Sequence, residues 1–106
     1  MTESAREEAR VTAMLESMAA TLGELLEAQI YSSVRRHPIL ARWRRQELRG
    51  GSAVILDADA EQALHVCRRT RQVLRESQQR YLQHGFEALA TRSEQALARI
   101  ATYLPE

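Results

Sequence analysis

The clearest pattern in the chain lies in residues 11–34, which read VTAMLESMAATLGELLEAQIYSSV. Apolar side chains recur there at spacings of mostly three and four residues, which is typical of one face of an amphipathic helix. Before this stretch, Ser4 can cap the start of the helix; after it, Pro38 disfavours helical geometry at the preceding residue. The pattern predicts a first helix over about residues 4–35. Its apolar face comprises Val11, Leu15, Met18, Leu22, Leu25, Ile30 and Val34.

The middle of the chain is divided by proline and glycine. Pro38 suits the first turn of a new helix, and Gly50 and Gly51 end it, which predicts a short helix over about residues 38–49. Residues 50–57 contain a β-branched run, but the sequence offers no second strand to pair with it, so an extended linker is favoured. Every regular element predicted for this chain is therefore helical, and the predicted fold class is all-α.

The last predicted element is a long helix over about residues 59–104, which Asp57 or Asp59 can cap. Its apolar residues keep a near-heptad spacing. This spacing continues past Gly85, which favours one continuous helix that carries a glycine penalty of about 1 kcal/mol. The alternative is a break at Gly85, after which Thr91 and Glu94 provide a capping box for a new helix.

The unequal lengths of the two long helices predict self-association. At a rise of about 1.5 Å per residue they would be roughly 50 and 67 Å long, so a hairpin of the two leaves part of the longer apolar stripe uncovered. A homodimer that completes a helical bundle would bury both stripes, whereas a fold-back at Gly85 would cover them within a monomer. The residues predicted for this core or dimer stripe are Leu15, Met18, Leu22, Leu25, Leu74, Tyr81, Leu89 and Ile100.

Length and composition narrow the class of protein. The 106 residues are 44% hydrophobic and carry 15 basic against 14 acidic groups, as expected for one globular domain over residues 1–106. No apolar run approaches the roughly 20 residues of a membrane span, and the N-terminus lacks the apolar stretch of a secretory signal. We therefore expect a cytoplasmic protein with no membrane partner.

No group of residues indicates catalysis or the binding of a metal or cofactor. The three histidines are scattered, and no zinc, calcium, nucleotide or serine-hydrolase motif occurs. We therefore expect a non-enzyme without catalytic, metal-binding or cofactor-binding residues. Cys67, the single cysteine, is expected to be a small buried residue of the apolar stripe. A thiol redox sensor is the alternative, if Cys67 is exposed beside its neighbouring arginines.

Charge is distributed unevenly along the chain. Residues 1–31 hold six acidic residues and two arginines, whereas residues 32–52 hold one acidic residue and six arginines. Because arginine binds phosphates and Trp43 could stack on a base, one hypothesis is a nucleic-acid-binding regulator. A net charge of only +1 weakens this hypothesis, and the acidic first helix or an acidic protein could neutralise the patch instead. The basic patch comprises Arg35, Arg36, Arg42, Arg44, Arg45 and Arg49.

A second candidate surface is apolar and lies in and beside the connection between the long helices. Burial in the core explains it most simply, but tryptophan is also enriched at binding hot spots. The favoured function is a non-catalytic regulator that binds another cytoplasmic protein, such as a transcription factor or a secreted or assembling client. It would mask that protein's association surface, as an antiactivator or a chaperone does. The predicted partner-binding residues are Ile39, Leu40, Trp43, Val54, Ile55 and Leu56.

Overall fold

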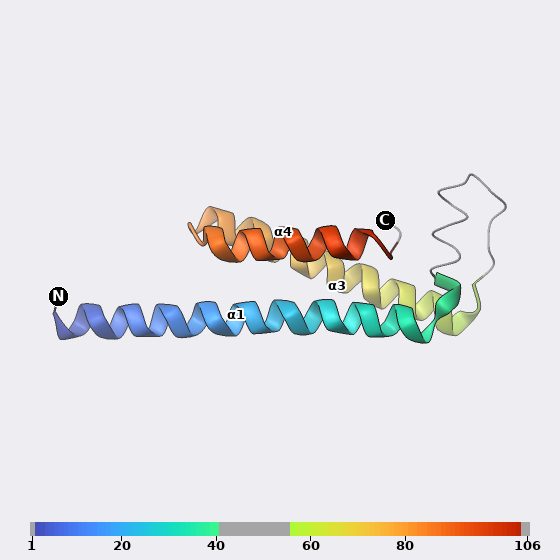
Figure 1. The fold of residues 1–106 in the computed structure, drawn as a ribbon, viewed down its shortest axis with the longest axis horizontal. Helices are drawn as coiled ribbons and strands as arrows, with labels where there is room; N and C mark the ends of the chain where they lie inside the picture. The colour runs from blue at the N-terminus through green and yellow to red at the C-terminus, as the bar shows by residue number, and fades with distance from the viewer. Residues whose placement is uncertain (1, 41–55, 105–106) are drawn as a thin grey trace.

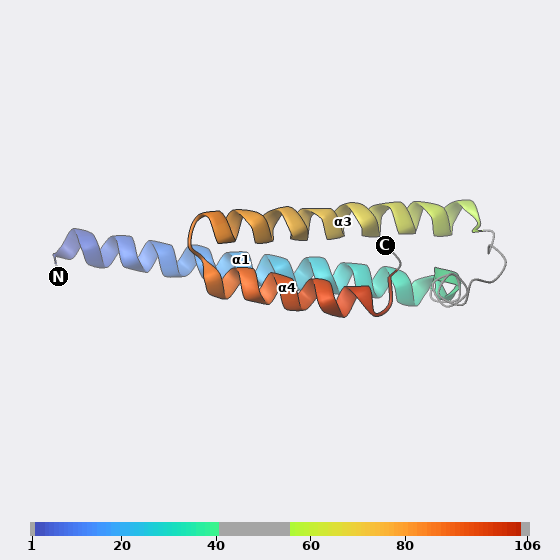
Figure 2. The same ribbon diagram turned by 90° about the horizontal axis from the view of Figure 1, so that it is seen from above.

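The computed structural model describes residues 2–40 and 56–104, which form an all-α fold (Figure 1). With the labels of Figure 1, the long helices are α1 (Glu3–Arg36), α3 (Ala58–Gln83) and α4 (Glu87–Ala101). These two described ranges contain no strand, which confirms the predicted fold class. Each long helix contacts the other two. Figures 1 and 2 show that α1 and α4 run in the same direction and α3 in the opposite one.

The bounds of α1 follow from local signals at its two ends. The side chain of Thr2, not that of Ser4, caps the helix, since its Oγ1 accepts a hydrogen bond from the amide of Ala5 at 3.2 Å. The helix ends at Arg36, directly before His37 and Pro38, as the proline predicts. Residues 38–40 are helical. The remainder of the short helix predicted over residues 38–49, and the linker up to residue 55, lie outside the described residues.

The prediction of one continuous helix over residues 59–104 is wrong, because the chain turns back after residue 83. Gly85 has φ of +79°, a left-handed conformation that side chains with a Cβ rarely adopt. The amide of Phe86 donates to the carbonyl of Tyr81 at 2.8 Å and that of Gly85 to Leu82 at 3.4 Å, which is the Schellman pattern of a helix end. The new helix begins at Glu87, ahead of the predicted Thr91 capping box.

Folding back at Gly85 is favoured because it covers apolar surface that a continuous helix would leave in water. Leu89 and Ile100 on α4 are buried against the other two helices. A continuous helix would carry a glycine penalty of about 1 kcal/mol, and folding back adds the burial of two such side chains, each of which contributes about 1.5–3 kcal/mol, so both effects favour the break. Tertiary packing therefore determines the break, and Gly85 supplies a place where it can occur without strain.

The two described glycines in or between helices should respond in opposite ways to alanine. Gly85→Ala should destabilise the fold by about 1–2 kcal/mol, because alanine must adopt a left-handed conformation there. Gly23→Ala should stabilise it by about 0.5–1 kcal/mol, since Gly23 lies inside α1 and an added Cβ would meet nothing within 4 Å. Urea unfolding at fixed protein concentration measures both. A stabilising Gly85→Ala variant would contradict the described turn.

The core lies where the C-terminal half of α1 meets the other two helices. Its side chains are buried and contact one another across all three helices. Asp57 positions the start of α3 beside this core, since its Oδ1 accepts a hydrogen bond from the amide of Ala60 at 2.8 Å. The buried residues of this cluster are Ile30, Val34, Leu40, Ala60, Leu64, Cys67, Leu74, Ile100 and Leu104.

Tyr103 connects the end of α4 to α1. Its ring packs edge-on against Tyr31, with ring centroids 5.6 Å apart. The Tyr103 hydroxyl is buried and has no hydrogen-bond partner among the described residues. Burial is the main cause that raises the pKa of Tyr103 from 10.0 to about 12.

This pKa shift predicts a loss of stability in alkali. In the unfolded chain Tyr103 ionises near pH 10, whereas in the folded chain it stays neutral until about pH 12. The contribution is therefore fully present below pH 10 and is lost as the pH rises towards about 12. Unfolding free energies measured across this range should fall more steeply for the natural protein than for Tyr103→Phe. Equal slopes would show that Tyr103 ionises in the folded protein as it does in the unfolded chain.

Candidate interaction surface on α1

A row of apolar side chains on α1 is exposed to solvent. It has the 4-3-4-3 spacing of a heptad seam, and Met14 lies beside it. Each of the six side chains is between 44% and 62% exposed. Four of them were predicted as core or dimer residues, and Met14 was not identified because it falls between the seam positions. We call these residues the α1 stripe: Val11, Met14, Leu15, Met18, Leu22 and Leu25.

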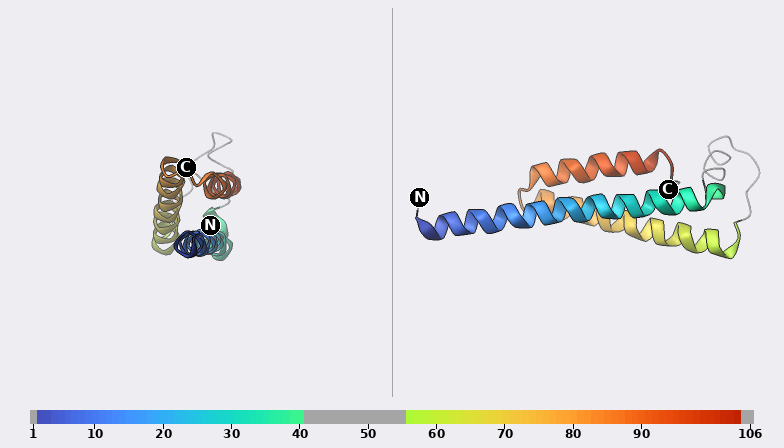
Figure 3. Two further views of the ribbon diagram at one scale, coloured as in Figure 1. Left: turned by 90° about the vertical axis from the view of Figure 1, so that its left-hand side faces the viewer. Right: turned by 60° about the horizontal axis from the view of Figure 1, so that its bottom comes forward.

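The α1 stripe and the core use different faces of the same helix. Ile30 and Val34 are buried in the core, and Leu26 packs against it. At about 100° per residue, this face is centred roughly 115° around the helix from the stripe. The side of α1 that meets α3 and α4 therefore leaves the stripe uncovered. Figure 3 shows in addition that the first turns of α1 project beyond the turn between α3 and α4.

The heptad positions that flank the stripe carry no charged residue. The heptad positions that flank it are occupied by small, hydroxyl or apolar residues (Thr12, Ala19, Leu26, Thr21 and Ala28, besides Met14). The carboxylates of the middle of α1, Glu16, Glu24 and Glu27, project from the far side of the helix, roughly 130–170° from the centre of the stripe. A helix that docks on the stripe would therefore meet no charge at these flanking heptad positions of α1.

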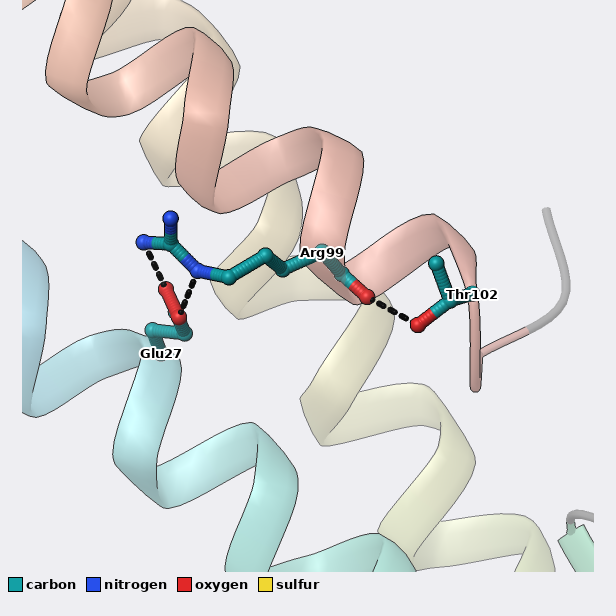
Figure 4. A network of polar contacts seen from close by, with 3 residues as sticks. All are labelled: Glu27, Arg99 and Thr102. Carbon is teal, nitrogen blue, oxygen red and sulfur yellow. Dashed lines mark hydrogen bonds and ion pairs between the residues drawn. The ribbon is translucent and has the colours of Figure 1, made fainter.

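Ion pairs hold α4 against that far side of α1. Arg99 binds Glu27 through two hydrogen bonds, Nε to Oε1 at 2.7 Å and a terminal guanidinium nitrogen to Oε2 at 2.9 Å (Figure 4). Arg92 lies 3.8 Å from Glu24. Three of the four side chains are more than half exposed, and each pair contributes at most about 1 kcal/mol. Two acidic residues of α1 thus pair with arginines of α4, 68 and 72 residues away in sequence, which no local pattern could indicate.

An apolar hollow adjoins the stripe where the α3–α4 turn meets α1. It has a volume of about 280 Å³, and its lining includes Leu15 of the stripe, the apolar or aromatic residues Tyr81, Phe86 and Leu89, and Glu16, Arg80 and His84. Tyr81 and Leu89 were predicted as core or dimer residues; Leu89 is buried and Tyr81 is partly buried. Leu15 therefore belongs both to the stripe and to the wall of this hollow.

The other residues of the predicted core or dimer stripe are buried within the chain. Leu74 and Ile100 are almost fully inaccessible and belong to the core cluster. The eight predicted residues thus separate into two sets. Leu74, Leu89 and Ile100 are buried by the chain itself and Tyr81 is partly buried, whereas the four residues on α1 are 57–62% exposed.

The predicted apolar partner surface requires a correction. Leu40 is 0% exposed and belongs to the core, so it cannot contact a partner. Ile39 and Leu56 pack against the same core and are only partly accessible. Core burial, the simpler interpretation of this sequence, holds for these three residues. Three further members of the predicted surface lie outside the described residues: Trp43, Val54 and Ile55.

The basic patch is described only at its beginning. Arg35 and Arg36 are exposed at the end of α1, and the Arg35 guanidinium lies 5.8 Å from the centre of the Tyr31 ring. This distance is typical of a cation–π contact. The remaining four arginines, Arg42, Arg44, Arg45 and Arg49, lie outside the described residues.

Cys67 is buried between α3 and α1. Its side chain is 1% exposed and its Sγ lies 4.0 Å from the carbonyl oxygen of Ile30. Burial raises the pKa of the Cys67 thiol, and this outweighs the lowering effects of a hydrogen bond with Ser33 and of two nearby arginines. A redox sensor needs an accessible thiol with thiolate character, so the geometry does not favour that alternative.

Alkylation should therefore be slow in the folded protein. Iodoacetamide should modify Cys67 about 100-fold more slowly in buffer than in denaturant, because the thiol must first be exposed by opening of the fold. Mass spectrometry over time gives both rates. Rapid modification of the folded protein would contradict the burial of Cys67 and would restore the redox hypothesis.

Among the residues that the structure describes, no three histidine, cysteine or acidic side chains gather as metal ligands would. None of the helices in the described part of the chain has the length and apolar character of a membrane span. Comparisons of the chain with protein-family models, with curated proteins and with solved structures gave no match.

Proposed function

We propose that this protein is a non-catalytic helical regulator that binds an amphipathic helix of another cytoplasmic protein along the α1 stripe. Binding would cover the surface through which that protein associates, as an antiactivator or a chaperone does. The observation that carries this proposal is the α1 stripe itself, five apolar side chains in heptad register and Met14 beside them, all about half exposed. Patches of this kind on a small monomer mark interaction sites.

The shape of the surface favours a helix as the bound element. Apolar residues at spacings of three and four form a straight seam along α1, and helices dock on such seams through residues with the same spacing. The side chains beside the seam are short or uncharged, which permits close approach from either direction. The hollow beside Leu15 could receive one large side chain of the partner.

A comparison of captured proteins from lysate tests the proposal. The natural protein, a Leu15→Asp/Leu22→Asp variant and a Ser17→Asp control would each be immobilised. Ser17 is an exposed residue of α1 on a different face from the stripe. We expect a stoichiometric protein that binds the natural chain and Ser17→Asp but not the stripe variant. The purified partner should then lose its own self-association when the natural chain is added.

Two results would remove the proposal. One is recovery of the same proteins by the stripe variant and by Ser17→Asp. The other is recovery of nucleic acid without a stoichiometric protein, which would favour the basic patch. In that case binding should weaken steeply between about 50 and 200 mM salt.

A further inference from the structure

The α1 stripe has the dimensions and symmetry that a second copy of the same chain would need. It extends from Val11 to Leu25 and is centred on Met18. A two-fold axis near Met18 would place the stripe of one chain on the stripe of the other, with the two helices antiparallel. The same surface patch then serves both copies, as a two-fold interface requires.

The charges of α1 favour the antiparallel direction. Residues 3–10 carry three glutamates and two arginines, a net charge of −1, and the last turn carries Arg35 and Arg36. Antiparallel pairing brings the acidic end of each helix towards the basic end of the other and opposes the two helix dipoles. Parallel pairing would instead align the dipoles and place the glutamates of the two copies together.

The projecting N-terminal turns of α1 would be stabilised by packing against a neighbour. All side chains of residues 2–18 are exposed, and Figures 1 and 3 show the beginning of α1 beyond the end of the α3–α4 hairpin. Isolated helical segments of this length are marginal in water, so packing normally stabilises them. With the axis near Met18, residues 3–11 of one copy would lie along residues 25–33 of the other.

The accessible area is sufficient for a specific dimer. Six side chains that are each about half exposed supply on the order of 600 Å² per copy, and thus about 1,200 Å² for the pair, which is the lower end of the range for specific interfaces. The flanking heptad positions carry no charge that would repel the same position in a second copy.

We propose that in the free protein a second copy of this chain covers the α1 stripe, with the two α1 helices antiparallel about a two-fold axis near Met18. Self-pairing then buries the surface that the proposed partner would bind. A partner must therefore displace one copy of the chain before it can bind the stripe. The competition between self-pairing and partner binding rests on the proposed function. The existence of the dimer does not, and it can be tested without any partner.

Single-cysteine variants in a Cys67→Ala background test the direction of pairing under mild oxidation. Met18→Cys should form a cross-linked dimer by itself, because both copies place this residue at the axis. Val11→Cys alone should not, since the two Val11 positions would be about 21 Å apart and a disulfide requires less than about 7 Å between Cα atoms. A mixture of Val11→Cys and Leu25→Cys chains should cross-link. Ser17→Cys, on another face of α1, is the matched control.

Sedimentation of the natural protein gives the mass directly, with 12.1 kDa for one chain and about 24 kDa for the dimer. A monomer at all concentrations, with no cross-link from any variant, overturns the inference and leaves partner capture by the stripe intact. Cross-linking of Val11→Cys alone overturns the antiparallel arrangement. A dimer with the expected cross-links, together with failure to capture any partner through the stripe, supports this inference and removes the proposed function.

Discussion

Ile100→Asp should unfold the protein. Ile100 is fully buried in the core cluster, where α4 packs against α1 and α3. The substitution removes a large apolar side chain and places a carboxylate among apolar neighbours, which together cost about 5 kcal/mol or more. Small domains have total stabilities of about 5–15 kcal/mol, so little folded protein should remain. Circular dichroism should show a loss of most of the helical signal at 25 °C.

Ala98→Asp is the matched control for that experiment. Ala98 lies on the same helix, two residues away, and is exposed. The introduced carboxylate stays in water, so the expected loss is about 1 kcal/mol or less, mainly from helix propensity. If both variants keep the helical signal and a similar melting temperature, Ile100 is not packed inside the chain, and the fold-back of α4 is incorrect.

Leu15→Asp/Leu22→Asp should leave the fold intact and abolish self-association. Both leucines are 57% exposed and lie outside the core cluster, so the two carboxylates remain hydrated in the single chain. Between two copies, however, the same groups would be desolvated in the seam without a cationic partner. That penalty is several kcal/mol, which corresponds to an increase of about 1,000-fold or more in the dimer dissociation constant. Sedimentation and circular dichroism should therefore report a helical monomer.

Ser17→Asp adds a carboxylate to another face of α1 and should leave the dimer unchanged. A Leu15→Asp/Leu22→Asp variant that still dimerises would place the interface elsewhere. One that loses its helical structure would show that the stripe is packed within the chain. Both this variant and Ile100→Asp replace an apolar side chain by aspartate, one in the exposed stripe and the other in the buried core. Comparing them therefore distinguishes the exposed apolar face from the buried one.

Local signals in the sequence located two helix ends directly. Pro38 marked the end of the first helix, which was predicted over residues 4–35 and spans Glu3–Arg36. Asp57 was one of two predicted caps of the next helix, and its side chain accepts the capping hydrogen bond. These predictions succeed because a cap or a proline acts on its immediate neighbours, and no distant contact is needed to identify it.

Other features could not be predicted in this way. Gly85 was recognised as a possible break, but the near-heptad spacing that continues across it favoured the wrong alternative. Leu40 was placed in a partner surface and is buried in the core. In both cases the outcome depends on which residues from elsewhere in the chain cover an apolar side chain, and a one-dimensional pattern contains no such information.

By itself, the sequence determined that the chain is helical, approximately where the first helix begins and ends, and which residues form its apolar seam. Only the tertiary structure decided that the second half folds back at Gly85, and that α1 turns Ile30 and Val34 towards the core while Leu15, Met18, Leu22 and Leu25 stay in water. Helical spacing is a property of neighbouring residues, and it makes a face apolar. Whether that face is buried depends on the free energy of packing against segments distant in the chain, which is settled only when all the helices are in place.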